Sequence, residues 1–299
     1  MSSIRKVALA GAAGSVGEAL IPELVASGFE VTALIRPGST STLPSSVKTV
    51  TVDFSDVSAL TDALTGFDAL ISTVGSPGIQ SQTYMVDAAV AAKVKRFIPS
   101  EFGSDMSNAR ARSLPVYKLK VEVEEYIENA LKGSETSYTP VYNSAFLDWG
   151  IQRKLLIDIE GKKMEMFDGG EKPYTAAPLS FVAKGVVGIL QHPEETANRA
   201  VRLHGTSITQ KKLLEIAQRV VGKDGWEVVE RSSEETEKQS YERLKKDPGN
   251  VMGWAIGFLT RSIYGEEFGS DFSGKNDNEL LGLKELNEKE VEEVVKGCV

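Results

Sequence analysis

The amino-acid sequence predicts an α/β protein with a doubly wound parallel sheet and a smaller α+β lobe. Short apolar runs alternate with amphipathic segments through the first half of the chain. Runs that are apolar on both faces are typical of parallel strands that helices cover on both sides. A glycine-rich turn joins the first apolar run to the first amphipathic segment. After residue 150 the alternation ends, and a mixed pattern of strand and helix signals indicates the second lobe.

In the first half, strands and helices are expected in strict alternation. The expected strands are Lys6–Ala10, Val31–Ile35, Thr49–Asp53, Ala69–Val74, Arg96–Pro99 and Tyr138–Tyr142. The expected helices are Val16–Ala26, Val57–Leu64, Thr83–Ala92 and Val116–Leu131. Residues 1–150 are therefore predicted to form the first domain, completed by about residues 180–205.

The second half predicts a smaller lobe from residues 151–179 and 206–299. A hairpin is expected from Lys163–Phe167 and Tyr174–Ala177, joined by Asp168-Gly169-Gly170. Further helices are expected at Ser180–Leu190, Thr209–Val221, Ser232–Lys246, Met252–Tyr264 and Asn287–Lys296, and further strands at Ala200–Leu203 and Trp226–Val229. The helix Met252–Tyr264 is rich in aromatic residues, and it either walls a substrate pocket or packs against the first lobe.

Composition restricts the classes of partner. The chain has 299 residues and a net charge of −8 without a basic cluster, which disfavours nucleic acid. Cys298 is its one cysteine, so no disulfide forms within the chain, and this suits the reducing cytoplasm. With His192 and His204 as the only histidines, no metal site is expected. No run approaches the roughly 20 apolar residues of a membrane span, so no membrane partner is expected.

The turn after the first strand has the spacing of a dinucleotide-binding motif. Gly11, Gly14 and Gly17 recur at every third position, directly between strand and helix. In such a turn the glycines allow the tight bend, the approach of a pyrophosphate and the packing of the helix on the sheet. The helix N-terminus adds N–H donors and a partial positive charge. We therefore predict a Rossmann fold whose turn, Gly11 to Gly17 with Ala13, Ser15 and Val16 between the glycines, binds the cofactor phosphates.

The end of the second strand indicates which dinucleotide binds. An NAD-binding protein needs an acidic side chain there for the ribose 2′-hydroxyl, but this chain has Arg36 in that place. A guanidinium pairs with a 2′-phosphate through charge and bidentate hydrogen bonds. Ser39 adds a hydroxyl donor nearby. The sequence therefore predicts NADPH/NADP+ as the cofactor.

Two further strand ends contribute to the predicted cofactor site. Asp53 and Phe54 close the third strand, where side chains flank the adenine. Thr73, Val74 and Gly75 close the fourth strand, where the backbone runs beneath the cofactor at the carboxyl edge of the sheet.

A lysine on the helix after the fifth strand is the candidate proton donor. The Tyr-x-x-x-Lys pair of short-chain dehydrogenases is absent, because the fourth residue after Tyr117 is Val121. At about 100° per residue, Lys120 lies roughly 60° from the centre of the apolar helix face and Lys118 about 140° away. That face holds Val116, Leu119, Val123, Ile127 and Ala130. Lys118 is thus expected in solvent. Lys120 is expected against apolar surface, either as a catalytic group or as a lysine at the core margin.

Several of these stretches, in this order, resemble the isoflavone reductase-like (NmrA-like) family of atypical short-chain dehydrogenases. They are the glycine motif, Leu34-Ile35-Arg36-Pro37, Lys95-Arg96-Phe97-Ile98-Pro99-Ser100-Glu101-Phe102-Gly103, Lys120 with Val121 and Ile127-Glu128, and Tyr138-Thr139 leading to Asn143-Ser144-Ala145-Phe146. The resemblance is firm over residues 4–150 and looser beyond.

The resemblance implies an NADPH-dependent reductase of small aromatic or conjugated metabolites. It aligns the family's general acid/base lysine with Lys120, beside the cofactor. It also implies that Ser100, Glu101 and Phe102 line the nicotinamide end. Asn143, which also contacts the cofactor, would form the pocket floor with Phe146, and Phe102 and Asn143 would contact the substrate as well.

The chain departs from the plant members of that family just after the lysine. Those enzymes carry arginines there, whereas this chain has Glu122, Glu124 and Glu125. Its spacer between Gly103 and Lys120 is also short. Lignan and isoflavonoid substrates of the plant type are therefore not expected.

Two rival hypotheses remain beside the reductase. NmrA-like proteins include NADP(H) sensors that control a partner protein without turnover, and Lys120 favours the enzyme over such a sensor. An epimerase that retains its cofactor is disfavoured by the missing Tyr–Lys pair. The chain is expected to act as a monomer or a homodimer.

Overall fold

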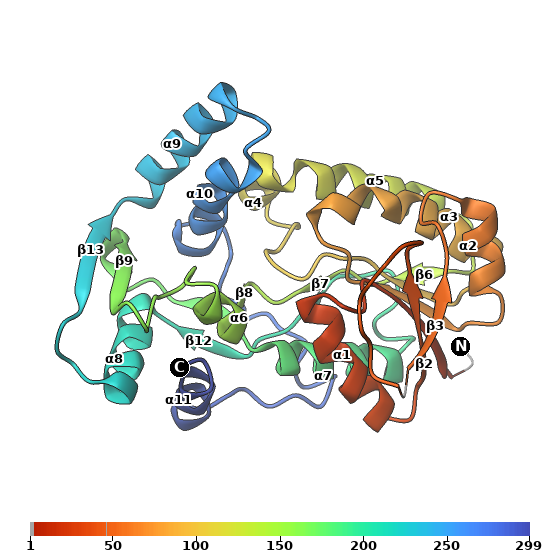
Figure 1. Ribbon diagram of the computed structural model, residues 1–299, viewed down its shortest axis with the longest axis horizontal. Coiled ribbons are helices and arrows are strands. Elements are labelled where there is room, and N and C mark those ends of the chain that lie inside the picture. The colour runs from red at the N-terminus through yellow and green to blue at the C-terminus, as the bar shows by residue number, and fades with distance from the viewer. Residues whose placement is uncertain (1–2, 46) are drawn as a thin grey trace.

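The predicted parallel sheet is present and has the doubly wound strand order. The structure is a computed structural model that describes residues 3–45 and 47–299 (Figure 1). Its six-stranded sheet has the order β3-β2-β1-β4-β5-β6, with every pair parallel. The strands are β1 Lys6–Ala10, β2 Glu30–Ile35, β3 Lys48–Thr51, β4 Ala69–Ser72, β5 Arg96–Ile98 and β6 Ser137–Tyr138. The strand order reverses between β1 and β4, which is where this fold class opens a ligand-binding crevice.

Helices cover both faces of this sheet, as the doubly apolar strands predicted. Helices α1 (Ser15–Ala26) and α7 (Leu179–Gln191) pack together on one face. Helices α2 (Val57–Leu64), α3 (Gln82–Ala91) and α5 (Lys118–Ala130) cover the other face (Figure 1). Each layer has its own apolar core against the strands. Because both faces are covered, only the strand ends remain accessible to a ligand.

Two predicted elements of the first half differ in the structure. The strand expected at Tyr138–Tyr142 is split into β6 and β7 (Val141–Tyr142), and β7 pairs with β11 (Val201–Arg202) instead of β5. Pro140 lies between the two pieces, and proline has no N–H for a strand ladder. The helix expected from Val116 begins at Lys118, after the 3-10 turn η2 (Pro115–Tyr117).

The hairpin predicted between residues 163 and 177 is wrong. Strand β9 (Lys163–Phe167) pairs in parallel with β13 (Glu227–Arg231). Strand β10 (Tyr174–Ala177) belongs to a separate three-stranded sheet with β8 (Ala145–Phe146) and β12 (Thr206–Ile208). Asp168, Gly169 and Gly170 of turn η3 (Asp168–Gly170) have φ values of 51°, 79° and 68°. A tight two-residue hairpin turn has at most two residues with positive φ, whereas this turn has three. The chain therefore does not fold back on itself here but passes from one sheet to the other.

Four further helices occur where helices were predicted: α8 (Gln210–Val221), α9 (Ser233–Lys246), α10 (Val251–Tyr264) and α11 (Glu288–Lys296). Three short helical elements were not predicted: η1 (Ser76–Ser81), α4 (Ala109–Arg112) and α6 (Leu147–Gln152). No helix among the described residues is long and apolar enough to cross a membrane.

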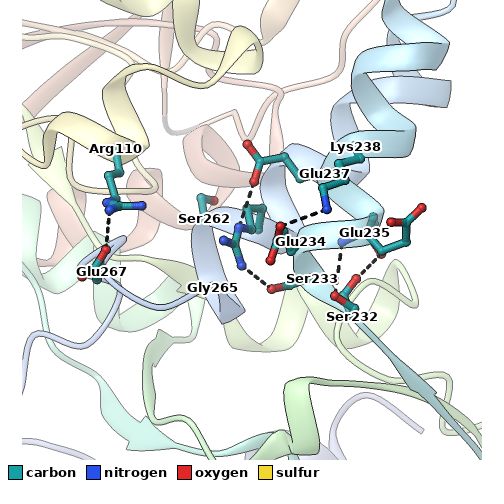
Figure 2. Close-up of polar contacts among 12 residues, drawn as sticks. Arg110, Ser232, Ser233, Glu234, Glu235, Glu237, Lys238, Ser262, Gly265 and Glu267 are labelled. Atoms are coloured by element: carbon teal, nitrogen blue, oxygen red, sulfur yellow. Dashed lines mark hydrogen bonds and ion pairs between the residues drawn. The ribbon is translucent and has the colours of Figure 1, made fainter.

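A polar junction fixes α9 and α10 to the rest of the second lobe. Arg261 of α10 donates from Nε to Glu237 Oε2 at 2.9 Å and from Nη1 to Ser233 Oγ at 2.7 Å. Ser233 in turn donates its backbone N–H to Asp168 Oδ1 at 3.0 Å. Figure 2 shows Ser233 and Glu237 projecting from α9 into this junction. The α9–α10 pair is thus attached to the turn that follows β9.

A second contact links this pair of helices to the first lobe. Arg110 Nη2 of α4 lies 2.6 Å from Glu267 Oε2, just after α10 (Figure 2). The Tyr117 hydroxyl of η2 shares hydrogen bonds with Ser104 Oγ at 2.7 Å and with Ser262 Oγ of α10 at 2.9 Å. Helix α10 therefore packs against the first lobe through η2, the second of the two arrangements that its composition allowed.

Candidate functional site

The glycine turn lies at the crevice where the strand order reverses. Gly11 has a φ of 82°, and a Cβ there would lie 2.6 Å from the carbonyl carbon of Thr73. A Cβ on Gly17 would lie 2.4 Å from the Gly11 carbonyl oxygen. Thr73 Oγ1 donates to the carbonyls of Ala10 and Gly11, both at 3.0 Å, and so ties the turn to the end of β4. Both glycines are thus required by close backbone packing.

The middle of this turn offers an open cradle for an anion. Ala13 and Gly14 are exposed, and Ser15 and Val16 are partly so. Gly14 is the N-cap of the 12-residue helix α1 and no side chain caps that end. The first backbone N–H groups of α1 are therefore free for a ligand, and the helix dipole favours a negative one. This arrangement fits the pyrophosphate of a dinucleotide.

Arg36 and Ser39 lie beside that cradle at the end of β2. Both are exposed, in a turn that the hydrogen bond from Ser39 N–H to the Arg36 carbonyl closes at 3.1 Å. Within residues 3–45 and 47–299, the Arg36 guanidinium forms no ion pair. A free guanidinium at this strand end fits a 2′-phosphate.

Asp53 and Phe54 differ in accessibility. Asp53 is exposed, and its Oδ1 accepts hydrogen bonds from Ser55 N at 2.9 Å and from Ser55 Oγ at 2.7 Å. These bonds lower the pKa of Asp53, so the side chain is an anion at neutral pH. Phe54 is only 8% exposed and packs in the core beneath the same edge.

The ends of β4 and β5 are held together by Ser100 and Gln82. Ser100 Oγ donates to the Val74 carbonyl at 2.8 Å, and Ser100 N–H donates to Gln82 Oε1 at 2.7 Å. Gln82 is fully buried at the start of α3. Gln82 was not among the predicted site residues, and its only signal in the sequence is a glutamine at the start of a mostly apolar helix.

Lys120 and Glu101 are in contact at the carboxyl end of β5. Lys120 projects from the first turn of α5, and its side chain is 23% exposed, whereas that of Lys118 is 79% exposed. Its Nζ donates to the Glu101 backbone carbonyl and lies 3.8 Å from Glu101 Oε2. Burial raises the pKa of the Glu101 carboxyl to about 7, although the charge of Lys120 opposes that shift. The helix periodicity thus distinguished the two lysines correctly.

A layer of charged and phenolic groups lies behind this pair. Glu124, one turn after Lys120, forms an ion pair with Arg112 of α4. Tyr142 OH donates to Glu124 Oε1 at 3.3 Å. Burial, reinforced by the charge of Glu124, raises the pKa of Tyr142, so its hydroxyl stays protonated. From the sequence, Glu124 was noted only as a departure from the plant enzymes, and its partners were not foreseen.

The backbone brings the two predicted lining segments together. The N–H groups of Asn143 and Ser144 donate to the Gly103 carbonyl at 3.1 and 2.9 Å. Phe102, which precedes Gly103, is 8% exposed and has a φ of 29°. Phe146 is half-buried and meets Trp149 edge-on, with ring centroids 6.3 Å apart. Of these aromatic residues, Phe102 directly follows Glu101 in the chain.

Buried polar atoms without partners cluster at this edge. Among the described residues, Ser72 Oγ, Gln82 Nε2, Glu101 Oε1 and Asn143 Oδ1 are buried and make no hydrogen bond. Buried polar groups are nearly always bonded in native proteins, so such a group points to a missing partner. Together with the glycine cradle, these atoms fit a ligand that lies across the carboxyl ends of β1 and β4.

The start of α5 and the turn before it differ in burial from a simple helical wheel. Leu119 was expected on the apolar face, but it is 37% exposed, because the first turn of α5 extends past the edge of the core. Tyr117 is buried, and its hydroxyl is shared with Ser104 and Ser262. In the part of the chain that the structure describes, no group of three His, Cys, Asp or Glu residues has the geometry of a metal site.

Comparison with known proteins decides the family. Residues 3–231 match the model of the NmrA-like family. The chain belongs to the NmrA-like family. It is 32% identical over 297 residues to "Oxidoreductase poxI" of Penicillium oxalicum, covering 96% of this chain and 92% of that protein. This NmrA-like chain is accordingly an oxidoreductase of the isoflavone reductase type.

Solved structures share the fold of this NmrA-like protein over its whole length. The leucoanthocyanidin reductase–NADPH complex from Vitis vinifera has a TM-score of 0.80 at 16% identity and covers 98% of both chains. A structure described as "AtPrR2 with NADP+ and (+)pinoresinol" has a TM-score of 0.71 at 21% identity and covers 100% of both chains. The predicted fold class, a Rossmann sheet with a smaller α+β lobe, is therefore confirmed.

Proposed function

We propose that this NmrA-like protein is an NADPH-dependent reductase of a small aromatic or conjugated metabolite. The observation that carries the proposal is the half-buried Lys120 amine, held at Glu101 on the same sheet edge as the Gly11–Gly17 cradle. When bound, NADPH supplies a hydride from C4 of its nicotinamide ring. The residues of the chain then bind, orient and protonate.

The proposed cofactor site extends across the crevice from β2 to β5. The N–H groups of α1 would hold the pyrophosphate and Arg36, with Ser39, the 2′-phosphate. The segment from Ser100 to Phe102 and the Asn143 side chain would line the nicotinamide end. The NADPH and NADP+ complexes of the two structural neighbours support this assignment.

Lys120 would act as the general acid. Hydride adds to one atom of a carbon–carbon, carbon–oxygen or carbon–nitrogen double bond, and the other atom takes the electron pair and needs a proton. At a benzylic carbon, hydride replaces an oxygen, and that leaving oxygen takes the electron pair and the proton. The Lys120 ammonium donates it and becomes a neutral amine, which solvent recharges because the side chain is 23% exposed. Phe102 and Phe146 provide the aromatic surface for a flat substrate.

The first test replaces Lys120 with methionine. NADPH oxidation is screened with conjugated aromatic ketones and imines, and Lys120→Met is expected to lower kcat at least about 100-fold with the Kd for NADPH unchanged. The matched control is Lys118→Met, two residues away on the exposed face, which should keep full activity. A Lys120→Met enzyme with normal kcat would exclude the proton-donor role.

A dinucleotide sensor without turnover is the second candidate function. It is favoured by exposed apolar side chains on α10, where Val251, Met252 and Ile256 are 46%, 69% and 40% exposed. Such a surface suits a partner protein. NADPH binding with no oxidation by any compound in the screen would favour the sensor. For either function the chain would act as a monomer or a homodimer, and its single cysteine suits the reducing cytoplasm.

A further inference from the structure

The Glu101 carboxyl is buried, and one of its two oxygens has no hydrogen bond among the described residues. Its side chain is 2% exposed, its Oε1 has no partner among the described residues, and its Oε2 lies 3.8 Å from Lys120 Nζ, beyond hydrogen-bond distance. An ionised carboxylate is costly in such a place, because no donor replaces the lost water. Burial accordingly raises the pKa of Glu101 to about 7, so this group gains or loses a proton near neutral pH.

The groups that face Glu101 come from four elements. They are Lys120 and Glu124 of α5, Arg112 of α4, Tyr117 of η2 and Tyr142 of β7. Arg112 is paired with Glu124, and both tyrosine hydroxyls are hydrogen-bonded with raised pKa values. Among these groups, Lys120 is therefore the one positive charge not already paired with another carboxylate. It lies on one side of Glu101, and Oε1 is left for another partner.

The position of Glu101 in the sheet indicates what that partner is. In a doubly wound sheet, the strands on each side of the reversal bind one mononucleotide half of the cofactor. Arg36 and the glycine turn mark the β1–β3 half as the adenosine side, and Glu101 follows β5 in the other half. That half would hold the nicotinamide, whose ring is cationic in NADP+ and neutral in NADPH.

We propose that the Glu101 carboxyl carries one exchangeable proton that is linked to the redox state of the bound cofactor. With NADPH the group is a neutral acid, and with NADP+ it is a carboxylate whose charge offsets that of the cationic ring. The proton leaves to solvent when NADP+ binds and returns when NADPH replaces it. This inference rests on the proposed function, because it requires NADP(H) at this site. Glu101 is thereby a positioning residue that also sets the charge beside Lys120.

The sign of the pH effect follows from this linkage. A carboxylate attracts a cationic ring and gives no such benefit to a neutral one. As pH rises through the pKa of Glu101, the carboxylate form increases, so NADP+ binding strengthens relative to NADPH binding. The ratio of the Kd for NADP+ to the Kd for NADPH should therefore fall, by at most about tenfold per pH unit for one proton.

Titration calorimetry with NADP+ and with NADPH, at several values from about pH 6 to about pH 8, tests the proposal without a substrate. Both dinucleotides carry the same 2′-phosphate, whose ionisation near about pH 6 therefore cancels in the ratio. The wild-type ratio is expected to fall severalfold over this range. In Glu101→Gln, which keeps the shape and cannot titrate, the ratio should be flat. The control Glu122→Gln removes an exposed carboxyl on α5, the helix that carries Lys120, and should retain the wild-type slope.

Three results would overturn the inference. A wild-type ratio that does not change with pH would exclude the linkage, and this measurement needs no variant to fold. A slope that survives in Glu101→Gln but disappears in Lys120→Met would assign the proton to the lysine. Failure of both dinucleotides to bind would overturn the proposed function as well, whereas binding of both with a flat ratio would overturn this inference alone.

Discussion

Arg36 and Lys120 are single residues whose roles were predicted from local position: Arg36 from the end of a strand, and Lys120 from its angle on a helix. Arg36 follows the last residue of β2, where the chain leaves the sheet, and it is exposed there without an ion pair among the described residues. Lys120 differs from Lys118 only by its angle on the same helix, yet its side chain is far less exposed. At this scale, local geometry is sufficient to place a side chain.

Arg36→Ala is expected to separate the two nicotinamide cofactors. It should raise the Kd for NADPH about 10- to 100-fold, since a hydrogen-bonded charge contact of about 1.5–3 kcal/mol is lost. Affinity for NADH, which lacks the 2′-phosphate, should be unchanged. Binding titrations with both dinucleotides measure the difference. Arg5→Ala is the control, because Arg5 is exposed at the opposite edge of the sheet and pairs with Glu30. Equal losses for both dinucleotides would contradict the assignment of Arg36.

At the scale of elements, the turn before α1 combines two different requirements for glycine. Gly17 is needed for packing, because a Cβ would lie 2.4 Å from the Gly11 carbonyl oxygen. Gly14 has a φ of −87°, which alanine adopts readily, and a Cβ there would lie 3.3 Å from that same oxygen and 3.8 Å from the Thr73 carbonyl oxygen. The space beside Gly14 is thus available to a ligand and not needed by the fold.

Alanine at Gly17 should therefore reduce stability, whereas alanine at Gly14 should reduce cofactor binding. Gly17→Ala is expected to lower the free energy of unfolding by about 1–3 kcal/mol, because the backbone must shift. Gly14→Ala should change Tm little and weaken NADPH binding at least about tenfold, since the added methyl group occupies the place of the pyrophosphate. Thermal unfolding and NADPH titration on both variants check this. A Gly14→Ala protein that binds NADPH normally would rule out the cradle.

Helix boundaries also follow from local signals. Thr209, Ser232 and Asn287 each accept a hydrogen bond from the first turn of the helix that follows, and Asn287 forms a full capping box with Glu290. Each of these helices begins one residue after its expected start, because the capping residue itself lies just outside the helix. Strand partners do not follow such local rules, and the predicted hairpin failed for that reason: β9 pairs with β13, about 60 residues further along.

At the scale of the whole molecule, distant segments are joined by buried charges. Asp105, after β5, forms an ion pair with Arg202 of β11 at 2.6 Å, and the two side chains are only 9% and 12% exposed. Arg96 is fully buried and donates to Ser137, Thr139 and Thr196, and it forms no ion pair within the described residues. These contacts connect the parallel sheet to the segment that returns from the second lobe.

The Asp105–Arg202 pair predicts how stability depends on pH. Burial alone would raise the pKa of Asp105, but hydrogen bonds from Arg202 and Ser107 outweigh it and lower the pKa below its ordinary value. A lowered folded pKa contributes stability that is present above the unfolded pKa and is lost as pH falls through the folded one. Asp105→Asn should therefore lower the free energy of unfolding by about 3 kcal/mol at neutral pH, because it leaves Arg202 buried without its partner.

Urea unfolding at about pH 7 and about pH 3 measures this effect, since the difference between wild type and Asp105→Asn should narrow in acid. Asp62→Asn, at an exposed position on α2, serves as the control and should show little difference at either pH. A wild-type advantage of equal size at both values would mean that the ion pair does not contribute through ionisation of Asp105.

Most of the α/β framework and part of the site could be predicted from the sequence. The strand and helix periods, the glycine turn, the guanidinium at the end of β2 and the choice of Lys120 over Lys118 all depend on residues within a few positions of one another. Covalent geometry and helix periodicity determine such relations before the chain folds.

Only the tertiary structure decided the partners. Glu101 and Lys120 are 19 positions apart, Gly103 receives its hydrogen bonds from Asn143 and Ser144, and Arg96 reaches Thr196 across 100 positions. Whether a carboxyl such as Glu101 is a solvated anion or a buried group with a pKa of about 7 depends on what those distant segments remove from water. The sequence by itself determined most of the elements, the glycine turn and the candidate lysine. The packing between elements determined the chemical state of the residues around that lysine.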